Sequence, residues 1–281
     1  MAELASAPRP RRRARRWLAF VLVAGLSAWA AAIACGMNPS VPSDFVLNLW
    51  PVPAVDPQLL APADARQLVV VQHGLWRSAF AMGRLERALR AHGYEVLNVS
   101  YPSTAARIED HAAALAAAID AYLARETGPK PCVSFVGHSL GGLVIRAYLA
   151  RADAVAPAAC VFVATPHRGA QLAARRQNDG MFRLFMGDLA AKQLVPGNPF
   201  FAGLRPLRGI PVGTLVGGKG DGVGFSASLP GDDDGTVTVD EAHADDETDS
   251  TMLPLGHTRL GFYDAPIARI LHFLRRGRFH D

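Results

Sequence analysis

The chain has 281 residues, 50% of them hydrophobic, which predicts one domain with a full core and a short additional segment. Its formal net charge is +4, but residues 1–34 hold six arginines and one glutamate, so the remainder carries −1. The basic charge belongs to an N-terminal tail, and we expect no nucleic-acid partner. No group of Cys, His and acidic residues has metal-ligand spacing, and no phosphate-binding glycine loop is present, so neither metal nor cofactor is expected.

Residues 1–35 are predicted to form a signal peptide or a membrane anchor. Six arginines between positions 9 and 16 precede Trp17–Ala34, eighteen uncharged residues that can just span a bilayer. Because arginines keep their end in the cytoplasm, the rest of the chain is expected in a bacterial cell envelope, facing the periplasm or the exterior. Cys35 follows a sequence similar to a lipoprotein cleavage box, with Ala32 where Leu is usual. An uncleaved anchor, a lipoprotein at Cys35 and a cleaved, secreted chain stay open, with a cytoplasmic chain as the remaining alternative.

Residues 36–65 are predicted to be a Pro-rich linker. Six prolines lie between residues 38 and 62, a density that prevents an α-helix and favours an extended spacer. Apolar residues between Phe45 and Trp50 interrupt it. They could pack onto the domain or rest on a bilayer surface, and the sequence does not choose.

From residue 66 onward, strand and helix patterns alternate, which predicts a mostly parallel sheet with helices on both faces. A cap inserted at about residues 169–209 is predicted where the alternation breaks, because the apolar run Met181–Met186 follows a strand. Such a cap would favour an apolar substrate group. The strands are expected at 68–72, 96–99, 132–136, 160–163, 211–216 and 252–255, and the helices at 84–92, 108–125, 143–150 and 267–274.

The segment from Gly137 to Gly141 has the G-x-S-x-G pattern of a nucleophile elbow. It stands between an apolar strand and a helix, the setting that this tight turn requires. The glycines leave room beside the turn, and the helix dipole lies beneath the Ser139 hydroxyl. We therefore expect Ser139 to be a nucleophile.

An acid and then a histidine should follow such a serine. Asp234 lies in a glycine turn after a strand, and His257 follows a short apolar run, so both are expected on loops beyond strand ends. His243 is the rival histidine, but it lies in an acidic run, Asp240–Asp249, that is predicted to be a solvated loop. The rival acids are Asp233, Asp221 and Asp240.

A second motif, His73-Gly74-Leu75, follows the first predicted strand. Turns of this kind supply one backbone N–H of an oxyanion hole, here that of Leu75. The other comes from the residue after the nucleophile, Leu140. The His73 side chain is expected to brace the loop.

Together these motifs resemble an α/β-hydrolase of the lipase and esterase kind, similar to the bacterial triacylglycerol lipases. The resemblance implies an α/β-hydrolase catalytic domain over residues 66–281. Two departures qualify it. Relatives that bind calcium place an acid beside the catalytic histidine, whereas this chain has Thr258 and Arg259, and strands that usually come before residue 68 are hard to find, which suggests a reduced sheet. The matching residues are His73–Gly74, the elbow around Ser139, Thr165–Gly169, Asp234–Val237 and Gly256–Thr258.

The sequence thus predicts a serine hydrolase that cleaves carboxylic esters, lipid-like or small, through Ser139, Asp234 and His257. An acyltransferase or amidase on the same residues is one alternative, because the triad does not determine the acceptor. A catalytically silent, membrane-tethered binding protein is another. Cys132 and Cys160, at the starts of neighbouring strands, are expected to be free thiols.

Overall fold

The structure, a computed structural model, describes residues 48–125, 127–179 and 188–281. The predicted membrane or signal segment Trp17–Ala34 and the predicted lipidation site Cys35 lie outside these ranges. Within them, no helix combines the length and the apolar character needed to cross a bilayer.

In the described part of the chain six strands form one sheet in the order β2-β1-β3-β4-β5-β6, and every neighbouring pair is parallel. The central strands are long apolar runs because helices cover both of their faces. The chain makes β1, crosses to the edge strand β2 and returns past β1 to make β3, so the strand order reverses between β1 and β3. Such a reversal opens a crevice at the carboxyl ends of the two strands. The strands are β1 (Gln67–Gln72), β2 (Glu95–Val99), β3 (Cys132–His138), β4 (Pro157–Val163), β5 (Val212–Gly217) and β6 (Asp249–Leu253).

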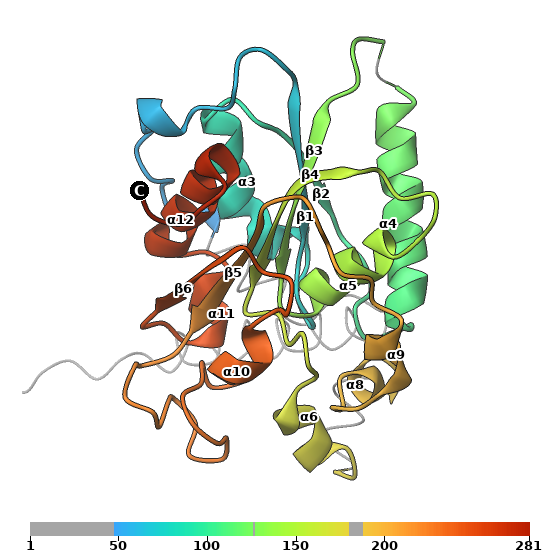
Figure 1. Cartoon of the computed structure of the whole chain (residues 1–281), viewed down its shortest axis with the longest axis vertical. Coiled ribbons are helices and arrows are strands. Elements are labelled where there is room, and N and C mark those ends of the chain that lie inside the picture. The colour runs from blue at the N-terminus through green and yellow to red at the C-terminus, as the bar shows by residue number, and fades with distance from the viewer. Residues whose placement is uncertain (1–47, 126, 180–187) are drawn as a thin grey trace, which may run out of the picture. The chain divides into compact units, whose positions relative to one another are not determined.

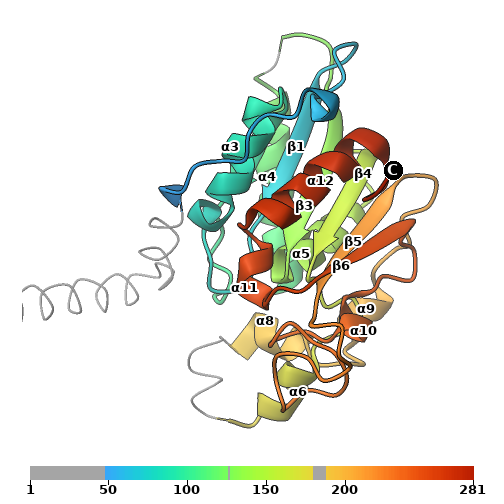
Figure 2. The same cartoon turned by 90° about the vertical axis from the view of Figure 1, so that its left-hand side faces the viewer.

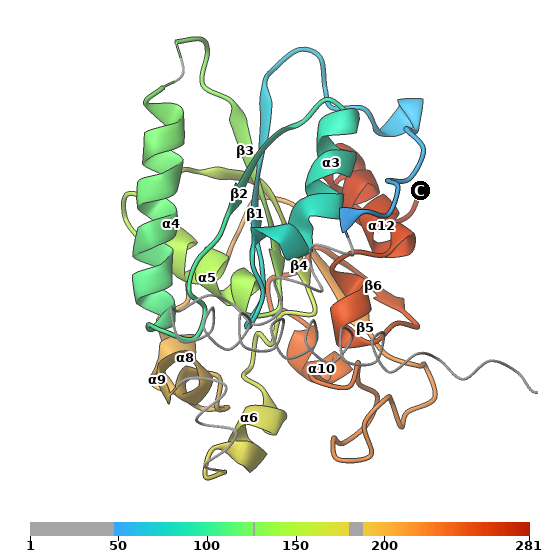
Figure 3. The ribbon, with the colours of Figure 1, turned by 180° about the vertical axis from the view of Figure 1, so that it is seen from behind.

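The helices lie on both faces of the sheet, as predicted (Figures 1 and 3). On one face α3 (Gly83–Ala91) and α12 (Asp264–Arg276) pack together, and on the other face lie α4 (Ile108–Leu123) and α5 (Leu140–Leu149). The helices α4 and α12 each bury an apolar stripe with spacings of three and four residues. In α12 the stripe comprises Ile267, Ile270 and Leu271, and in α4 it comprises Ile108, Ala112, Leu115 and Ile119.

Short helices gather at the carboxyl end of the sheet, where the cap was predicted (Figure 2). Between β4 and β5 the chain forms α6 (Gln171–Arg176), α8 (Asp188–Gln193) and α9 (Pro199–Ala202). The segment is tied to the domain because the Gln193 side chain accepts a hydrogen bond from Ile108 N at the start of α4, at 2.8 Å. The predicted apolar run Met181–Met186 lies outside the described residues. After β5 come α10 (Val239–Ala242) and, after β6, α11 (His257–Leu260).

Residues 48–65, which lie within the predicted Pro-rich linker 36–65, pack along the domain. Trp50 makes an edge contact with Phe262, the side chain of Leu59 is buried, and Arg84 in α3 donates hydrogen bonds to the Pro51 carbonyl. Between residues 51 and 65 the prolines prevent an α-helix, and the described chain forms the 3₁₀ turn η1 (Pro57–Leu59) there. Their carbonyls and the apolar side chains between them stay available for packing, so this part of the Pro-rich segment lies against the domain, one of the two possibilities that the sequence leaves open.

The two cysteines of the sheet are free, one exposed and one buried. Cys160 lies opposite Phe135 in the parallel register, three residues along β3 from Cys132. Burial raises the pKa of the Cys160 thiol, so it behaves as a small hydrophobe.

Candidate active site

The turn after β3 holds Ser139 in a strained backbone conformation, with φ 55° and ψ −126°. A positive φ is costly in free energy for a residue with a side chain. The Ser139 backbone keeps this conformation because the segments packed around the turn hold it in place. The Ser139 N–H donates to the Val163 carbonyl on β4 at 2.8 Å. A methyl group on Gly141 would overlap the backbone carbonyls at the end of β1, so the turn packs directly on that strand and only glycine fits. The structure therefore has the strand-turn-helix elbow that the sequence predicts.

His257 and Asp234 come from two other loops and meet Ser139. His257 Nε2 lies 3.0 Å from Ser139 Oγ, and its Nδ1 lies 2.7 Å from Asp234 Oδ2. The Asp234 side chain is 1% exposed, and its Oδ1 accepts the N–H groups of Thr236 and Val237 at 2.9 and 2.8 Å. These bonds fix the carboxylate, so that Oδ2 points at the imidazole. The arrangement can move a proton from the serine to the histidine and stabilise the resulting imidazolium.

The rival acids have other partners. Asp233 is buried and accepts N–H groups from Ser226 and Gly235, which folds the loop before Asp234. Asp221 caps the backbone at residues 223 and 224, and the exposed Asp240 pairs with Arg168. Only Asp234 among the four is within hydrogen-bond distance of His257.

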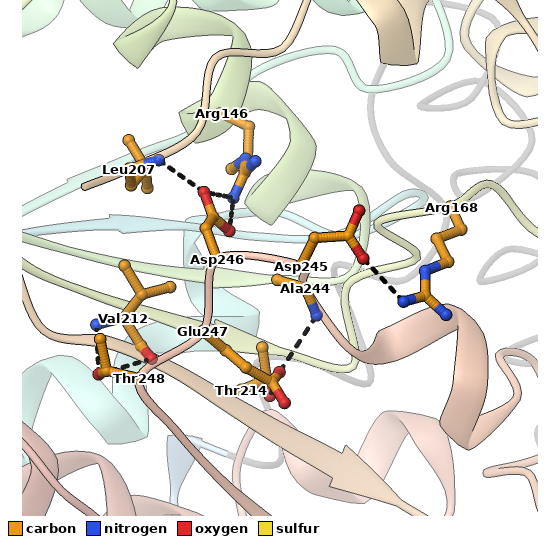
Figure 4. A network of polar contacts seen from close by, with 10 residues as sticks. All are labelled: Arg146, Arg168, Leu207, Val212, Thr214, Ala244, Asp245, Asp246, Glu247 and Thr248. Carbon is orange, nitrogen blue, oxygen red and sulfur yellow. Dashed lines mark hydrogen bonds and ion pairs between the residues drawn. The ribbon is translucent and has the colours of Figure 1, made fainter.

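The rival histidine, His243, belongs to a polar network on the flank of β5 and β6 rather than to a solvated loop. Its Nδ1 lies 2.8 Å from Glu247, whose other oxygen contacts Thr214 and Ala244 N. Figure 4 shows Asp246 held by the Arg146 guanidinium at 2.7 Å and by Leu207 N. The prediction of a solvated run was wrong for these residues. The acidic residues are evident in the sequence. The groups that bind Asp246, Arg146 and the backbone amide of Leu207, come from distant parts of the chain.

The loop after β1 approaches the serine closely. A methyl group on Gly74 would lie 3.0 Å from Ser139 Cβ, so the backbone at Gly74–Leu75 borders the nucleophile. Leu140, the other predicted oxyanion donor, is the first residue of α5. The two predicted donors thus belong to the two segments that flank the Ser139 side chain.

His73 braces this loop from inside the protein. Its Nδ1–H donates to the Gly74 carbonyl at 2.9 Å, its Nε2 accepts the Tyr101 N–H at 3.2 Å, and its ring stacks on that of Tyr101. Burial lowers the pKa of His73 to about 4, so the ring is neutral at physiological pH. The bracing role predicted for this side chain agrees with these contacts.

A further histidine, His138, contacts the site and was not singled out by the sequence. Its Nε2 lies 3.0 Å from the backbone carbonyl oxygen of His257, and the two ring centres are 5.0 Å apart. The residue is buried, and burial next to His257 lowers the pKa of its imidazole well below the usual value. Only its place, directly before the predicted nucleophile, could have drawn attention to it.

No curated protein matches the chain, but a family model does. It is described as the alpha/beta hydrolase family and matches residues 68–274. The chain belongs to this family. Over the described residues its sheet has six strands, all parallel, in agreement with the reduced sheet that the sequence suggests.

Solved structures share the fold of this alpha/beta hydrolase at low sequence identity. A metagenomic carboxyl esterase has a TM-score of 0.58 and 18% identity, with 81% of this chain and 78% of the esterase covered. The mature lipase BlEst2 of Bacillus licheniformis has a TM-score of 0.51 and 22% identity, covering 76% and 91%. Phospholipase PlaB of Legionella pneumophila has a TM-score of 0.52 and 19% identity, covering 63% and 45%.

Among the residues that the structure describes, no three His, Cys, Asp or Glu side chains lie close enough to hold a metal ion. Beside His257, the Arg259 guanidinium lies over the Tyr263 ring at 5.6 Å. A cation at this place would repel a divalent ion.

Proposed function

We propose that this alpha/beta hydrolase is a serine hydrolase that cleaves carboxylic esters through an acyl-enzyme. The observation that carries the proposal is the unbroken line of contacts from Asp234 Oδ2 to His257 Nδ1 at 2.7 Å and from His257 Nε2 to Ser139 Oγ at 3.0 Å. The family membership and the lipase and esterase names of the structural neighbours support ester chemistry.

In the first half-reaction, Ser139 Oγ forms a bond to the ester carbonyl carbon while His257 Nε2 takes the hydroxyl proton. Electrons of the carbonyl double bond move onto its oxygen, which accepts hydrogen bonds from Leu75 N–H and Leu140 N–H. The tetrahedral species then expels the alkoxide, which leaves as the alcohol after it takes the proton from His257. Asp234 stabilises the imidazolium between these steps.

In the second half-reaction, water replaces the serine as nucleophile. His257 Nε2 accepts a proton from the water as its oxygen attacks the acyl carbon, and Ser139 Oγ leaves with that proton. The acid is released and the serine is restored. An acyltransferase would use an alcohol in place of water, and an amidase would release an amine, so the acceptor and the leaving group distinguish these alternatives.

The test is labelling with a fluorophosphonate, followed by an ester panel of graded acyl length. Ser139→Ala should lose labelling and lower kcat about a thousandfold or more. The exposed Ser228, whose hydroxyl contacts that of Ser226, provides the control, because Ser228→Ala should react like the wild type. Labelling that survives in Ser139→Ala would refute the assignment. Absence of labelling in the folded wild type would favour the catalytically silent binding protein.

The same panel identifies the reaction. Matching amides measure amidase activity, and added alcohols measure acyl transfer as ester products. The helices α6, α8 and α9 stand at the carboxyl end of the sheet, which supports a cap over an apolar acyl group (Figure 2). We therefore expect longer acyl chains to lower KM within the panel.

We further propose that the enzyme is held at a membrane of the bacterial cell envelope, with its catalytic domain on the outer side. The support is in the sequence: Trp17–Ala34 can span or nearly span the hydrocarbon, and the preceding arginines orient it. Fractionation of wild type and Cys35→Ser distinguishes the two tethered forms. Release or unprocessed accumulation of the variant identifies a lipoprotein, and unchanged membrane association identifies a helical anchor. A wild type that is wholly soluble in the cytoplasm would contradict both.

A further inference from the structure

His138 and Ser139, which are adjacent in the chain, hold opposite ends of the same residue. The Ser139 hydroxyl lies 3.0 Å from the ring atom Nε2 of His257, and the His138 ring lies 3.0 Å from the backbone carbonyl oxygen of His257. The N–H of His257 is held as well, because it donates to the Asp234 carbonyl at 2.8 Å. The backbone of His257 is thus fixed from both sides, and one of its two restraints is the His138 side chain.

The His138 ring occupies a slot between the two loops that border the nucleophile. A methyl group on Gly74 would lie 3.0 Å from His138 Nδ1, and one on Gly261 would lie 3.7 Å from Cγ and Cδ2 of the same ring. The ring therefore lies close to both the loop that carries Leu75 and the segment that follows His257.

We propose that His138 is a positioning residue of the serine hydrolase: its Nε2–H donates to the His257 carbonyl and thereby holds the imidazole of His257 in line with Ser139 Oγ. The inference rests on the proposed function, because it acts through His257 as the general base. His138 touches no reacting atom. Its contribution is to reduce the range of orientations that the His257 backbone can adopt.

The direction of the hydrogen bond follows from elementary chemistry. A backbone carbonyl only accepts, so Nε2 of His138 carries the hydrogen. Burial lowers the pKa of His138 far enough that the ring stays neutral while His257 gains and loses its proton. A neutral donor suits this place, since a second positive charge 5.0 Å from the imidazole would oppose proton transfer to it.

The experiment compares side chains that fill the slot with and without a donor at the right distance. Glutamine reaches the His257 carbonyl because its amide nitrogen is as many bonds from Cβ as Nε2 of histidine. Asparagine is one bond too short, and leucine has no donor. We expect His138→Leu and His138→Asn to lower kcat about tenfold or more with KM within about twofold, and His138→Gln to recover most of kcat.

A second buried histidine provides the matched control. His92 directly follows α3, far along the chain from the catalytic residues. Its ring is hydrogen-bonded to the Ala88 carbonyl at 2.7 Å and to Asp56 N at 3.1 Å. His92→Leu should lower the melting temperature by an amount similar to that caused by His138→Leu while its kcat stays within about twofold of the wild type. A loss of stability alone therefore does not reproduce the expected pattern.

The outcomes separate this inference from the proposed function. If Ser139→Ala keeps labelling, the proposed function fails. If Ser139→Ala loses labelling but His138→Leu has wild-type kcat, only the positioning role fails. Where His138→Leu does not fold, His138→Asn takes its place in this comparison. The positioning role fails equally if His138→Gln is as slow as the two non-donating variants, since the donor then contributes nothing.

Discussion

Asp234 contacts His257 twice, once through its side chain and once through its backbone. Oδ2 lies 2.7 Å from Nδ1 of the imidazole, and the Asp234 carbonyl oxygen accepts the His257 N–H at 2.8 Å. The two contacts have different consequences. The backbone bond keeps the two loops together whatever side chain is present, whereas the carboxylate alone determines which ring nitrogen carries the hydrogen.

Replacing Asp234 by Asn should therefore lower kcat by about 10³–10⁴-fold with little loss of stability. The amide oxygen can keep the bonds to Thr236 N and Val237 N, which leaves the amide NH₂ facing His257. The imidazole must then place its hydrogen on Nε2, where it cannot accept the serine proton. Steady-state kinetics and thermal melting measure the two effects. Asp240→Asn, at an exposed acid paired with Arg168, is the control and should keep wild-type kcat.

Asp233→Asn distinguishes folding from catalysis at the neighbouring acid. Asp233 is fully buried and accepts Ser226 N and Gly235 N, so the variant should lose about 1–3 kcal/mol of unfolding free energy. Its kcat should stay within a few-fold of the wild type in the folded fraction. Urea denaturation and active-site titration check this pair of outcomes. If the kcat of Asp233→Asn were as low as that of Asp234→Asn, Asp233 rather than Asp234 would be the acid that acts on His257.

Gly141→Ala should prevent an active elbow from forming. The added methyl group would overlap the carbonyl oxygens of Gln72 and His73, and backbone cannot move aside as a flexible side chain can. We expect poor folding or a loss of kcat of at least a hundredfold, measured on purified protein with matched circular dichroism. Gly128→Ala is the control, because its methyl group would meet only an arginine side chain at 3.7 Å. Full activity of Gly141→Ala would mean that β1 and the elbow are further apart than described.

The sheet and its helices could be predicted because they depend on local patterns. Continuous apolar runs indicate strands buried on both faces, and apolar spacings of three and four indicate the helices packed on them. The elbow could be placed for a similar reason, since Gly137 and Gly141 lie within a few residues of Ser139. Each of these signals is contained in one short window of the chain.

Contacts between distant segments could not be predicted in this way. The three aspartates at 232–234 look alike in sequence, and only the folded loop directs Asp232 and Asp233 to backbone amides and Asp234 to His257. The partly buried ion pair of Arg146 with Asp246 joins residues a hundred positions apart. His138 belongs to the same class, because its partner is 119 positions away and no periodicity marks it.

Chelation should leave both activity and stability unchanged. The place beside His257 where calcium-binding relatives carry an acid holds Thr258 and Arg259, and the Arg259 guanidinium lies over the Tyr263 ring. Calcium needs several oxygen ligands, and a fixed cation opposes its binding. Ester hydrolysis and melting temperature should be the same with EDTA and with added calcium. A drop in either that calcium reverses would contradict this expectation.

Acid should destabilise the fold through its buried histidines, among them His73. The pKa of His73 is about 4 in the folded protein because the ring is buried, against 6.5 for an unperturbed histidine. Between these values the unfolded chain binds a proton that the folded protein does not, so stability falls as the pH is lowered from about 6.5 to about 4 and changes no further from this group below that. The shift corresponds to roughly 3 kcal/mol. His138 and His167, whose pKa values are also lowered by burial, act in the same direction.

Urea denaturation at about pH 7 and about pH 4.5 should show this loss of stability. His73→Asn, which keeps a donor near Nδ1 but cannot titrate, should be less stable at neutral pH and less sensitive to acid. An NMR titration in which the His73 ring of the folded protein gains its proton near pH 6.5 would refute this account.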